Sequence, residues 1–172
     1  MNRLTRATTA ILLSAGLSTG LSSPVAAAPA AVVDFNGDGF TDLALGVPGE
    51  DSSGQADAGR VNIVYGSAGG LTGVGNQALD QSVLVGTLEA GDRFGSALTT
   101  GDFNGDGFTD LAVGVPGEDS SGQADAGRVN IVYGSAGGLS TVGNQALDQS
   151  ILAGTLEAGD GFGSALAAGN FG

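Results

Sequence analysis

The sequence has no cysteine, histidine or tryptophan, and its five basic residues are all arginine. A chain without cysteine cannot rest its fold on disulfide bonds, so backbone pairing and packing must stabilise it. General-base and covalent catalysis rely mainly on histidine, cysteine and lysine, none of which is present. We therefore expect a protein that is not an enzyme.

Positive charge is also scarce, because five arginines face 18 acidic residues and give a net charge of −13. Binding to nucleic acid or to an anionic membrane surface requires a cluster of basic side chains. The composition therefore argues against both, and we expect no nucleic-acid partner.

The first 30 residues are typical of a secretory signal peptide. Arg3 and Arg6 precede an apolar stretch at 10–22 and a run of small residues at 24–31. Thirteen interrupted residues are too few for a membrane span, which needs about 20. We expect cleavage after Ala30 and a secreted chain without a membrane span. The remaining three arginines and 18 acidic residues would carry a net charge of −15.

The rest of the chain is an internal duplication. Residues 34–101 align without gaps on residues 102–169, a period of 68, and differ at eight positions. Self-similarity at a fixed period is typical of repeat architectures, so both copies should fold alike.

Each copy opens with the same nine residues, Asp-Phe-Asn-Gly-Asp-Gly-Phe-Thr-Asp. Oxygen-bearing side chains at positions 1, 3, 5 and 9, with a backbone carbonyl at position 7, match the ligand spacing of a calcium loop. We predict two Ca²⁺ sites. The first uses Asp34, Asn36, Asp38, Phe40 and Asp42, and the second uses Asp102, Asn104, Asp106, Phe108 and Asp110.

Two other interpretations of these loops compete with calcium in a β-hairpin. Asn and Asp also favour turns that hold no metal. The glycine at position 6 fits a helical EF-hand loop as well, but position 12 of that loop requires a bidentate glutamate. This chain has Leu45 and Val113 there, within apolar strand patterns. The spacing therefore favours a loop between strands.

Short apolar runs bounded by Gly, Pro, Asn and Asp predict four strands per copy. In the second copy we place them at 94–100, 110–115, 128–133 and 150–154. No stretch shows apolar residues at helical spacing, and 33 glycines disfavour long helices. The chain is predicted to be all-β, and tandem four-stranded units are typical of β-propeller blades.

Several further side chains invite an interpretation. Arg60 and Arg128 each follow an aspartate by three residues, so we expect local ion pairs with Asp57 and Asp125. Tyr65 and its counterpart 68 residues later end a predicted strand, where they would lie at the edge of the core or, alternatively, form part of a binding platform.

Three motifs in one unit resemble a known repeat: Phe94-Gly95, then the loop beginning at Asp102, then Gly114-Val115-Pro116. This order is similar to the FG-GAP repeats of the integrin α-subunit β-propeller, and glycosylphosphatidylinositol phospholipase D carries similar repeats. The resemblance implies a calcium-binding module for extracellular binding or adhesion, with a protein or carbohydrate partner. Alternatively, it implies an accessory repeat region of a secreted hydrolase.

The repeat also predicts how the chain divides. We place a first blade at 31–93, lacking most of its first strand (26–33), a second blade at 94–161, and the first strand of a further repeat at 162–172. Propellers close with about four to eight blades. We therefore expect either part of a longer propeller or a head-to-tail homo-oligomer.

Overall fold

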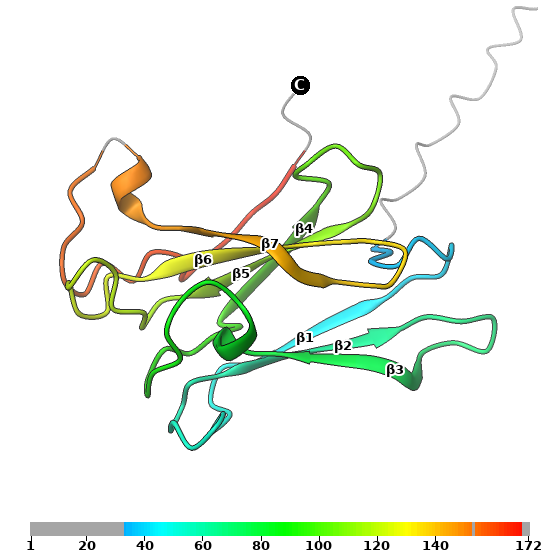
Figure 1. Ribbon diagram of the computed structural model, residues 1–172, viewed down its shortest axis with the longest axis horizontal. Coiled ribbons are helices and arrows are strands. Elements are labelled where there is room, and N and C mark those ends of the chain that lie inside the picture. The colour runs from blue at the N-terminus through cyan, green and yellow to red at the C-terminus, as the bar shows by residue number, and fades with distance from the viewer. Residues whose placement is uncertain (1–32, 153, 170–172) are drawn as a thin grey trace, which may run out of the picture. The chain divides into compact units, whose positions relative to one another are not determined.

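The computed structural model describes residues 33–152 and 154–169, and these form two antiparallel sheets (Figure 1). The first sheet has the order β1-β2-β3, and the second has the order β4-β5-β6-β7. The prediction of an all-β chain is confirmed, and sheets of three and four strands are consistent with propeller blades. The strands are β1 (Leu43–Val47), β2 (Arg60–Tyr65), β3 (Thr72–Leu79), β4 (Ala97–Gly101), β5 (Asp110–Val115), β6 (Arg128–Tyr133) and β7 (Ser140–Leu147). A 3₁₀ turn comes after the last strand of each sheet, η1 (Gln81–Val83) after β3 and η2 (Gln149–Ile151) after β7.

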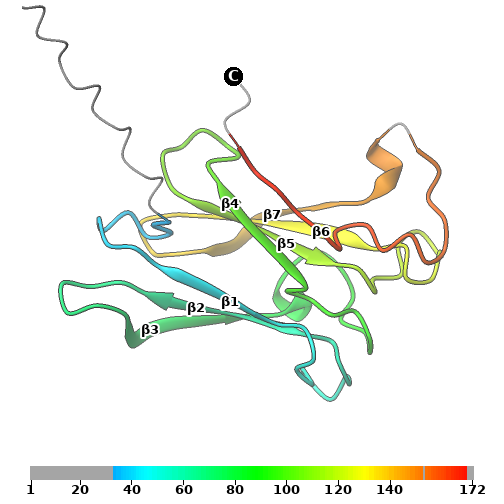
Figure 2. The same ribbon diagram turned by 180° about the vertical axis from the view of Figure 1, so that it is seen from behind.

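The main core lies between the two sheets, which stack in both views (Figure 2). Alternate residues of a strand point to opposite faces. Leu111, Val113 and Val115 of β5 therefore share one face, and all three are fully buried. They pack with Val61 and Ile63 of β2. The two sheets therefore pack through opposite faces, although their equivalent strands have nearly the same sequence.

The second and third predicted strands of the second copy match β5 and β6. The prediction of a fourth strand at 150–154 was wrong, because the fourth strand is β7. Asp148 accepts a hydrogen bond from the Ser150 amide (2.9 Å) and begins η2, so the apolar residues that follow lie in a turn. Ile151 and Leu152 are exposed there.

The strand predicted from Phe94 begins three residues later, at Ala97. The reason is that Phe94 is tied to the first sheet: its amide donates to the Ala58 carbonyl (2.9 Å), and its side chain is fully buried. Next to it, a Cβ added to Gly46 would lie 2.1 Å from the Gly95 carbonyl oxygen. The two glycines of the repeated motifs therefore permit the backbones of consecutive units to touch.

Residues 162–169 repeat this anchoring but form no strand ladder, contrary to the prediction. The Phe162 amide donates to the Ala126 carbonyl (2.9 Å), as in the first copy. Within the described part of the chain, residues 165–169 pair with no strand, whereas the equivalent β4 pairs with β5.

The predicted signal peptide and most of the strand predicted at 26–33 lie outside the described residues. No helix within the described part of the chain is long and apolar enough to cross a membrane.

Candidate calcium loops and the junction between the sheets

The first aspartate of each predicted calcium loop organises the turn. Asp34 Oδ1 accepts hydrogen bonds from the amides of Gly37 (2.7 Å) and Asp38 (3.2 Å), and its Oδ2 accepts one from Gly39 (2.9 Å). Gly37 and Gly39 have φ values of 71° and 86°, a region that glycine adopts without steric cost. The loop is therefore held in one conformation by its own backbone.

The second loop has the same geometry. Asp102 Oδ1 accepts from Gly105 (2.7 Å) and Asp106 (3.1 Å), and Oδ2 accepts from Gly107 (3.0 Å). Asn104 and Asp106 interact as their counterparts do, through the asparagine Nδ2 and an aspartate oxygen (2.9 Å). Since one loop lies before the first sheet and the other between β4 and β5, the conformation follows from the nine residues themselves.

The last aspartate of each loop has a role that the spacing did not reveal. Asp42 is almost fully buried, and its two oxygens accept hydrogen bonds from the amides of Phe35 (2.8 Å) and Gly66 (2.8 Å). Asp110 makes the equivalent bonds to Phe103 (2.7 Å) and Gly134 (2.8 Å). Asp42 therefore joins its loop to the end of β2, and Asp110 joins its loop to the end of β6.

The donor chemistry of the loops fits calcium, because carboxylate, amide and carbonyl oxygens are the ligands that Ca²⁺ prefers. Asp34, Asn36 and Asp38 supply the side-chain oxygens of the first loop, with equivalents 68 residues later. Within residues 33–152 and 154–169, no group of three or more acidic side chains is gathered as a metal site. Calcium binding therefore stays a prediction.

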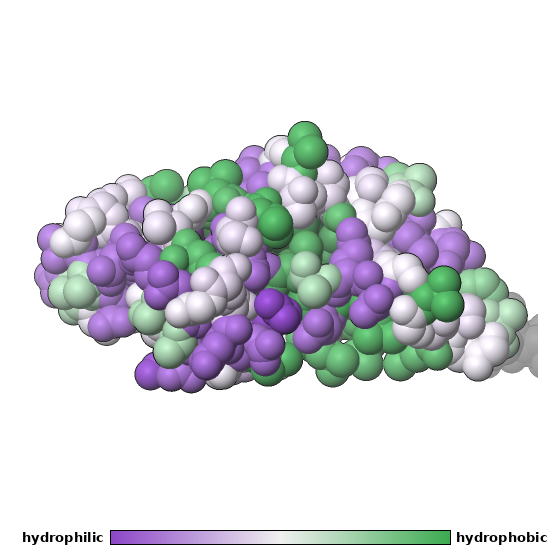
Figure 3. Space-filling view, turned by 60° about the horizontal axis from the view of Figure 1, so that its bottom comes forward, coloured by the Kyte–Doolittle hydropathy of each residue, from purple (hydrophilic) through white to green (hydrophobic). Residues whose placement is uncertain are grey.

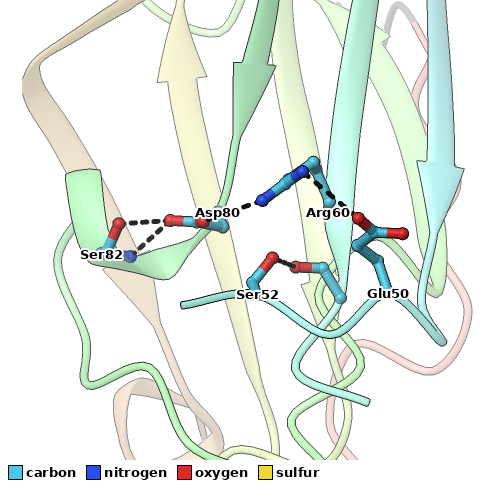
Figure 4. A network of polar contacts seen from close by, with 6 residues as sticks. Glu50, Ser52, Arg60, Asp80 and Ser82 are labelled. Atoms are coloured by element: carbon cyan, nitrogen blue, oxygen red, sulfur yellow. Dashed lines mark hydrogen bonds and ion pairs between the residues drawn. The ribbon is translucent and has the colours of Figure 1, made fainter. Parts of the chain in front are cut away.

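A polar cluster beyond the first sheet corrects the expected arginine pairing. Arg60 contacts Glu50 (3.3 Å) and Asp80 (3.9 Å), so the predicted local pair with Asp57 was wrong (Figure 4). Asp80 also accepts a hydrogen bond from the Ser82 amide (2.9 Å) and so begins η1. Asp57 itself lies in a turn with positive φ (51°), and its amide donates a hydrogen bond to Asp51 Oδ1 (3.0 Å).

The equivalent cluster of the second sheet is buried, because the first sheet covers it. Arg128 pairs with Glu118 (2.7 Å) and not with Asp125 as predicted, and Glu118 also accepts a hydrogen bond from Gln81 of η1. Glu118 and Gln81 are both buried. Its equivalent in the first unit, Glu50, has the same local sequence but is only partly buried, so the sequence did not reveal this junction.

Asp92 lies at the same junction and is fully buried. Burial, together with the nearby carboxylates of Glu118, Glu89 and Asp119, raises the pKa of Asp92 to about 7, although a hydrogen bond from the Glu89 amide (2.6 Å) opposes this rise. Burial likewise raises the pKa of Glu118. A carboxyl with no exposed surface cannot reach a substrate, so we interpret the cluster as structural.

The two tyrosines also differ in environment. Tyr65 is buried at the edge of the core, where its hydroxyl forms hydrogen bonds with Gln77 and with the Leu139 amide. Burial raises the pKa of Tyr65. Tyr133 is only half-buried. The interpretation of Tyr65 as a core-edge aromatic residue is therefore confirmed.

The fold and the loop geometry define a class: tandem all-β repeats, each pairing an Asx-rich loop with a Phe-Gly anchor. Residues 26–64 and 94–132 match the FG-GAP repeat. The chain is an FG-GAP repeat protein, related to integrin α subunits and to phosphatidylinositol-glycan-specific phospholipase D.

Three similar proteins illustrate the relationship. The chain is 43% identical over 105 residues to phosphatidylinositol-glycan-specific phospholipase D of Mus musculus, covering 61% of this chain and 12% of the relative. It is 39% identical over 143 residues to mouse integrin alpha-IIb, covering 79% of this chain, and 35% identical over 137 residues to integrin alpha-8 of Gallus gallus, covering 77%. The matched region spans 12% of the length of each of these relatives.

Proposed function

We propose that the chain is a secreted, non-catalytic FG-GAP region that binds calcium and serves as the accessory repeat region of a secreted hydrolase. The observation that supports this best is the higher identity to phosphatidylinositol-glycan-specific phospholipase D, 43% against 35% and 39% for the two integrin chains. The absence of histidine, cysteine and lysine supports a non-catalytic role, in which any hydrolysis is performed by a separate catalytic region.

Calcium has a definite place in this proposal. Asp34, Asn36 and Asp38 would hold the ion with the Phe40 carbonyl, as would their counterparts in the second loop. The loop amides already bond to these side chains, so the loop requires little reordering to bind the ion, which lowers the cost of binding. The ion would neutralise carboxylates that otherwise repel each other, and thereby stabilise both sheets.

The second candidate function is adhesion to an extracellular protein or carbohydrate, supported by the longer stretches matched in the integrin α chains. An immobilised chain should then retain matrix proteins or glycans in Ca²⁺ and release them in EDTA. The accessory role predicts no such retention. Hydrolysis of a phosphatidylinositol-glycan-anchored reporter by the purified chain alone would contradict both, since each is non-catalytic.

Thermal melting with and without Ca²⁺ tests the metal component. We expect Ca²⁺ to raise the melting temperature and EDTA to reverse the rise. Asp38→Asn and Asp106→Asn, each in one loop, should reduce the rise. Asp51→Asn, an exposed carboxylate outside both loops, should leave it unchanged. A melting temperature that does not respond to Ca²⁺ in the unmodified chain would refute the calcium sites.

A further inference from the structure

Equivalent apolar side chains of the two sheets differ sharply in exposure, and the exposed ones lie on one face of the first sheet. Leu43, Leu45 and Val47 of β1 are exposed on the outer side of the first sheet. Figure 3, in which the lower side of Figure 1 comes forward, shows apolar residues gathered there among polar ones. Their equivalents on β5 are fully buried, because the first sheet covers them. The outer face of the first sheet is thus equivalent to the face of the second sheet that is buried against the sheet before it.

A hollow of about 400 Å³ adjoins this face. We call it the Leu71 hollow, and Phe40, Leu43, Gly66, Gly70 and Leu71 are among the residues that line it. Leu71 is 56% exposed.

The equivalent position of the second unit is filled by the first sheet. Leu139 is only 3% exposed, and its amide donates to Gln77 Oε1 (3.0 Å) and to the Tyr65 hydroxyl (3.3 Å). Gln77 Nε2 donates in return to the Leu139 carbonyl (3.0 Å). A Cβ on Gly138 would lie 2.0 Å from the Tyr65 hydroxyl, so glycine is needed for this contact. The first unit has a glycine at the equivalent position, Gly70, which lines the Leu71 hollow.

The outer edge of the first sheet is also unpaired in the described residues. β1 pairs with β2 alone, whereas its equivalent β5 also pairs with β4, from Ala97 opposite Gly114 to Gly101 opposite Asp110. Unpaired strand edges are templates for a further strand.

The same chain carries the complement of this face on its second sheet. Tyr133 and Gln145 stand where Tyr65 and Gln77 stand in the first sheet, with Tyr133 half-buried and Gln145 exposed. Residues 165–169, equivalent to β4, pair with no strand in the described part of the chain. Phe162 and Leu166 already pack on this second sheet, as Phe94 and Leu98 pack on the first.

From this complementarity we infer that two copies of the chain dock head to tail. Gln145 and Tyr133 of one copy enter the Leu71 hollow of the next, and residues 165–169 of the first copy pair with β1 of the second. The contact repeats the interface between the two sheets, residue by residue, so its chemistry is already present inside each chain. It does not depend on the proposed function.

Such a contact joins two different surfaces, so copies add in one direction until a ring closes. With two blades per copy, roughly three or four copies would complete a propeller of six to eight blades. The net charge of −13 opposes assembly through repulsion between copies, and screening by salt should favour it.

Sedimentation velocity of the purified full chain in Ca²⁺ tests the inference. We expect a species of more than one copy that grows with protein concentration and with salt. Leu71→Asp, which blocks the hollow, and Gln145→Asp, which blocks its complement, should each reduce the chain to monomer. Both positions are exposed, so both variants should fold, and circular dichroism checks this.

A mixture of the two variants is decisive. The Leu71→Asp copy keeps an intact complement, and the Gln145→Asp copy keeps an intact hollow, so together they should form a dimer of one copy each and stop there. Val74→Asp is the control, since Val74 and its equivalent Val142 are 81% and 82% exposed and the repeated contact covers neither; it should assemble as the unmodified chain does.

The inference is overturned if the unmodified chain stays monomeric at every concentration, as it would if another segment of the chain covered β1. It is also overturned if Val74→Asp disrupts assembly as much as Leu71→Asp does, or if the mixed variants remain monomeric.

Discussion

Replacing Phe94 with alanine should destabilise the two sheets together. The Phe94 side chain is fully buried in the core between the sheets, and its amide is bonded to the Ala58 carbonyl of the first unit. Removing a buried phenylalanine side chain costs about 3 to 5 kcal/mol, because apolar contact is lost and a cavity remains. For a unit of this size, each kcal/mol shifts the melting temperature by roughly 3 °C, so we expect a fall of about 10 to 15 °C.

Phe162 supplies a matched control. It occupies the same position of the duplicated sequence but is only half-buried, since among the described residues no further sheet covers it. Phe162→Ala should therefore cost less, about 1 to 2 kcal/mol. Urea denaturation and thermal melting in dilute solution, followed by circular dichroism, measure both variants. If Phe162→Ala is as damaging as Phe94→Ala, or if Phe94→Ala melts within about 3 °C of the unmodified chain, the assignment of the core is wrong.

Three further changes test other parts of the structure. Because the pKa of Asp92 is raised to about 7, the folded chain keeps a proton that the unfolded chain releases, so stability should fall as pH rises from about 4 to 7. Asp92→Asn should flatten this dependence of stability on pH, as measured by urea titrations. Asp160→Asn, at the exposed equivalent position, should leave the dependence unchanged. Gly46→Ala brings a Cβ within 2.1 Å of the Gly95 carbonyl oxygen and should cost about 1 to 3 kcal/mol of unfolding free energy, whereas Gly73→Ala, with open space around it, should change little. Asp42→Ala leaves two backbone amides without acceptors and should destabilise the chain by about 2 kcal/mol or more even in EDTA; an effect confined to Ca²⁺-containing buffer would refute this structural role.

Much of the fold could be predicted from local pattern. The repeat period, the all-β character, β5 and β6 follow from runs of β-branched and apolar residues bounded by Gly and Pro. β7 was missed because half of its residues are exposed, none is fully buried, and it contains Gly143, so it lacks a buried apolar face. The run at 151–153 was mistaken for a strand, although Asp148 followed by Ser150 is a signal for the turn that begins there.

The environment of the site could not be predicted in the same way. The loop residues were identified from their spacing, but the bonding of Asp42 and Asp110 to distant amides depends on where β2 and β6 end. Glu118 and Glu50 have the same local sequence, yet only Glu118 is covered by another sheet. Burial that comes from a neighbouring unit leaves no trace in a sequence whose copies are nearly identical.

Differential scanning calorimetry tests most directly the central claim, that the anchor beginning at Phe94 and the shared core make the two sheets one unit. Because the core includes residues of both sheets, neither should unfold alone. We predict a single transition in Ca²⁺-containing buffer, with equal calorimetric and van't Hoff enthalpies. Two resolved transitions, or a sheet that survives the unfolding of the other, would contradict the account.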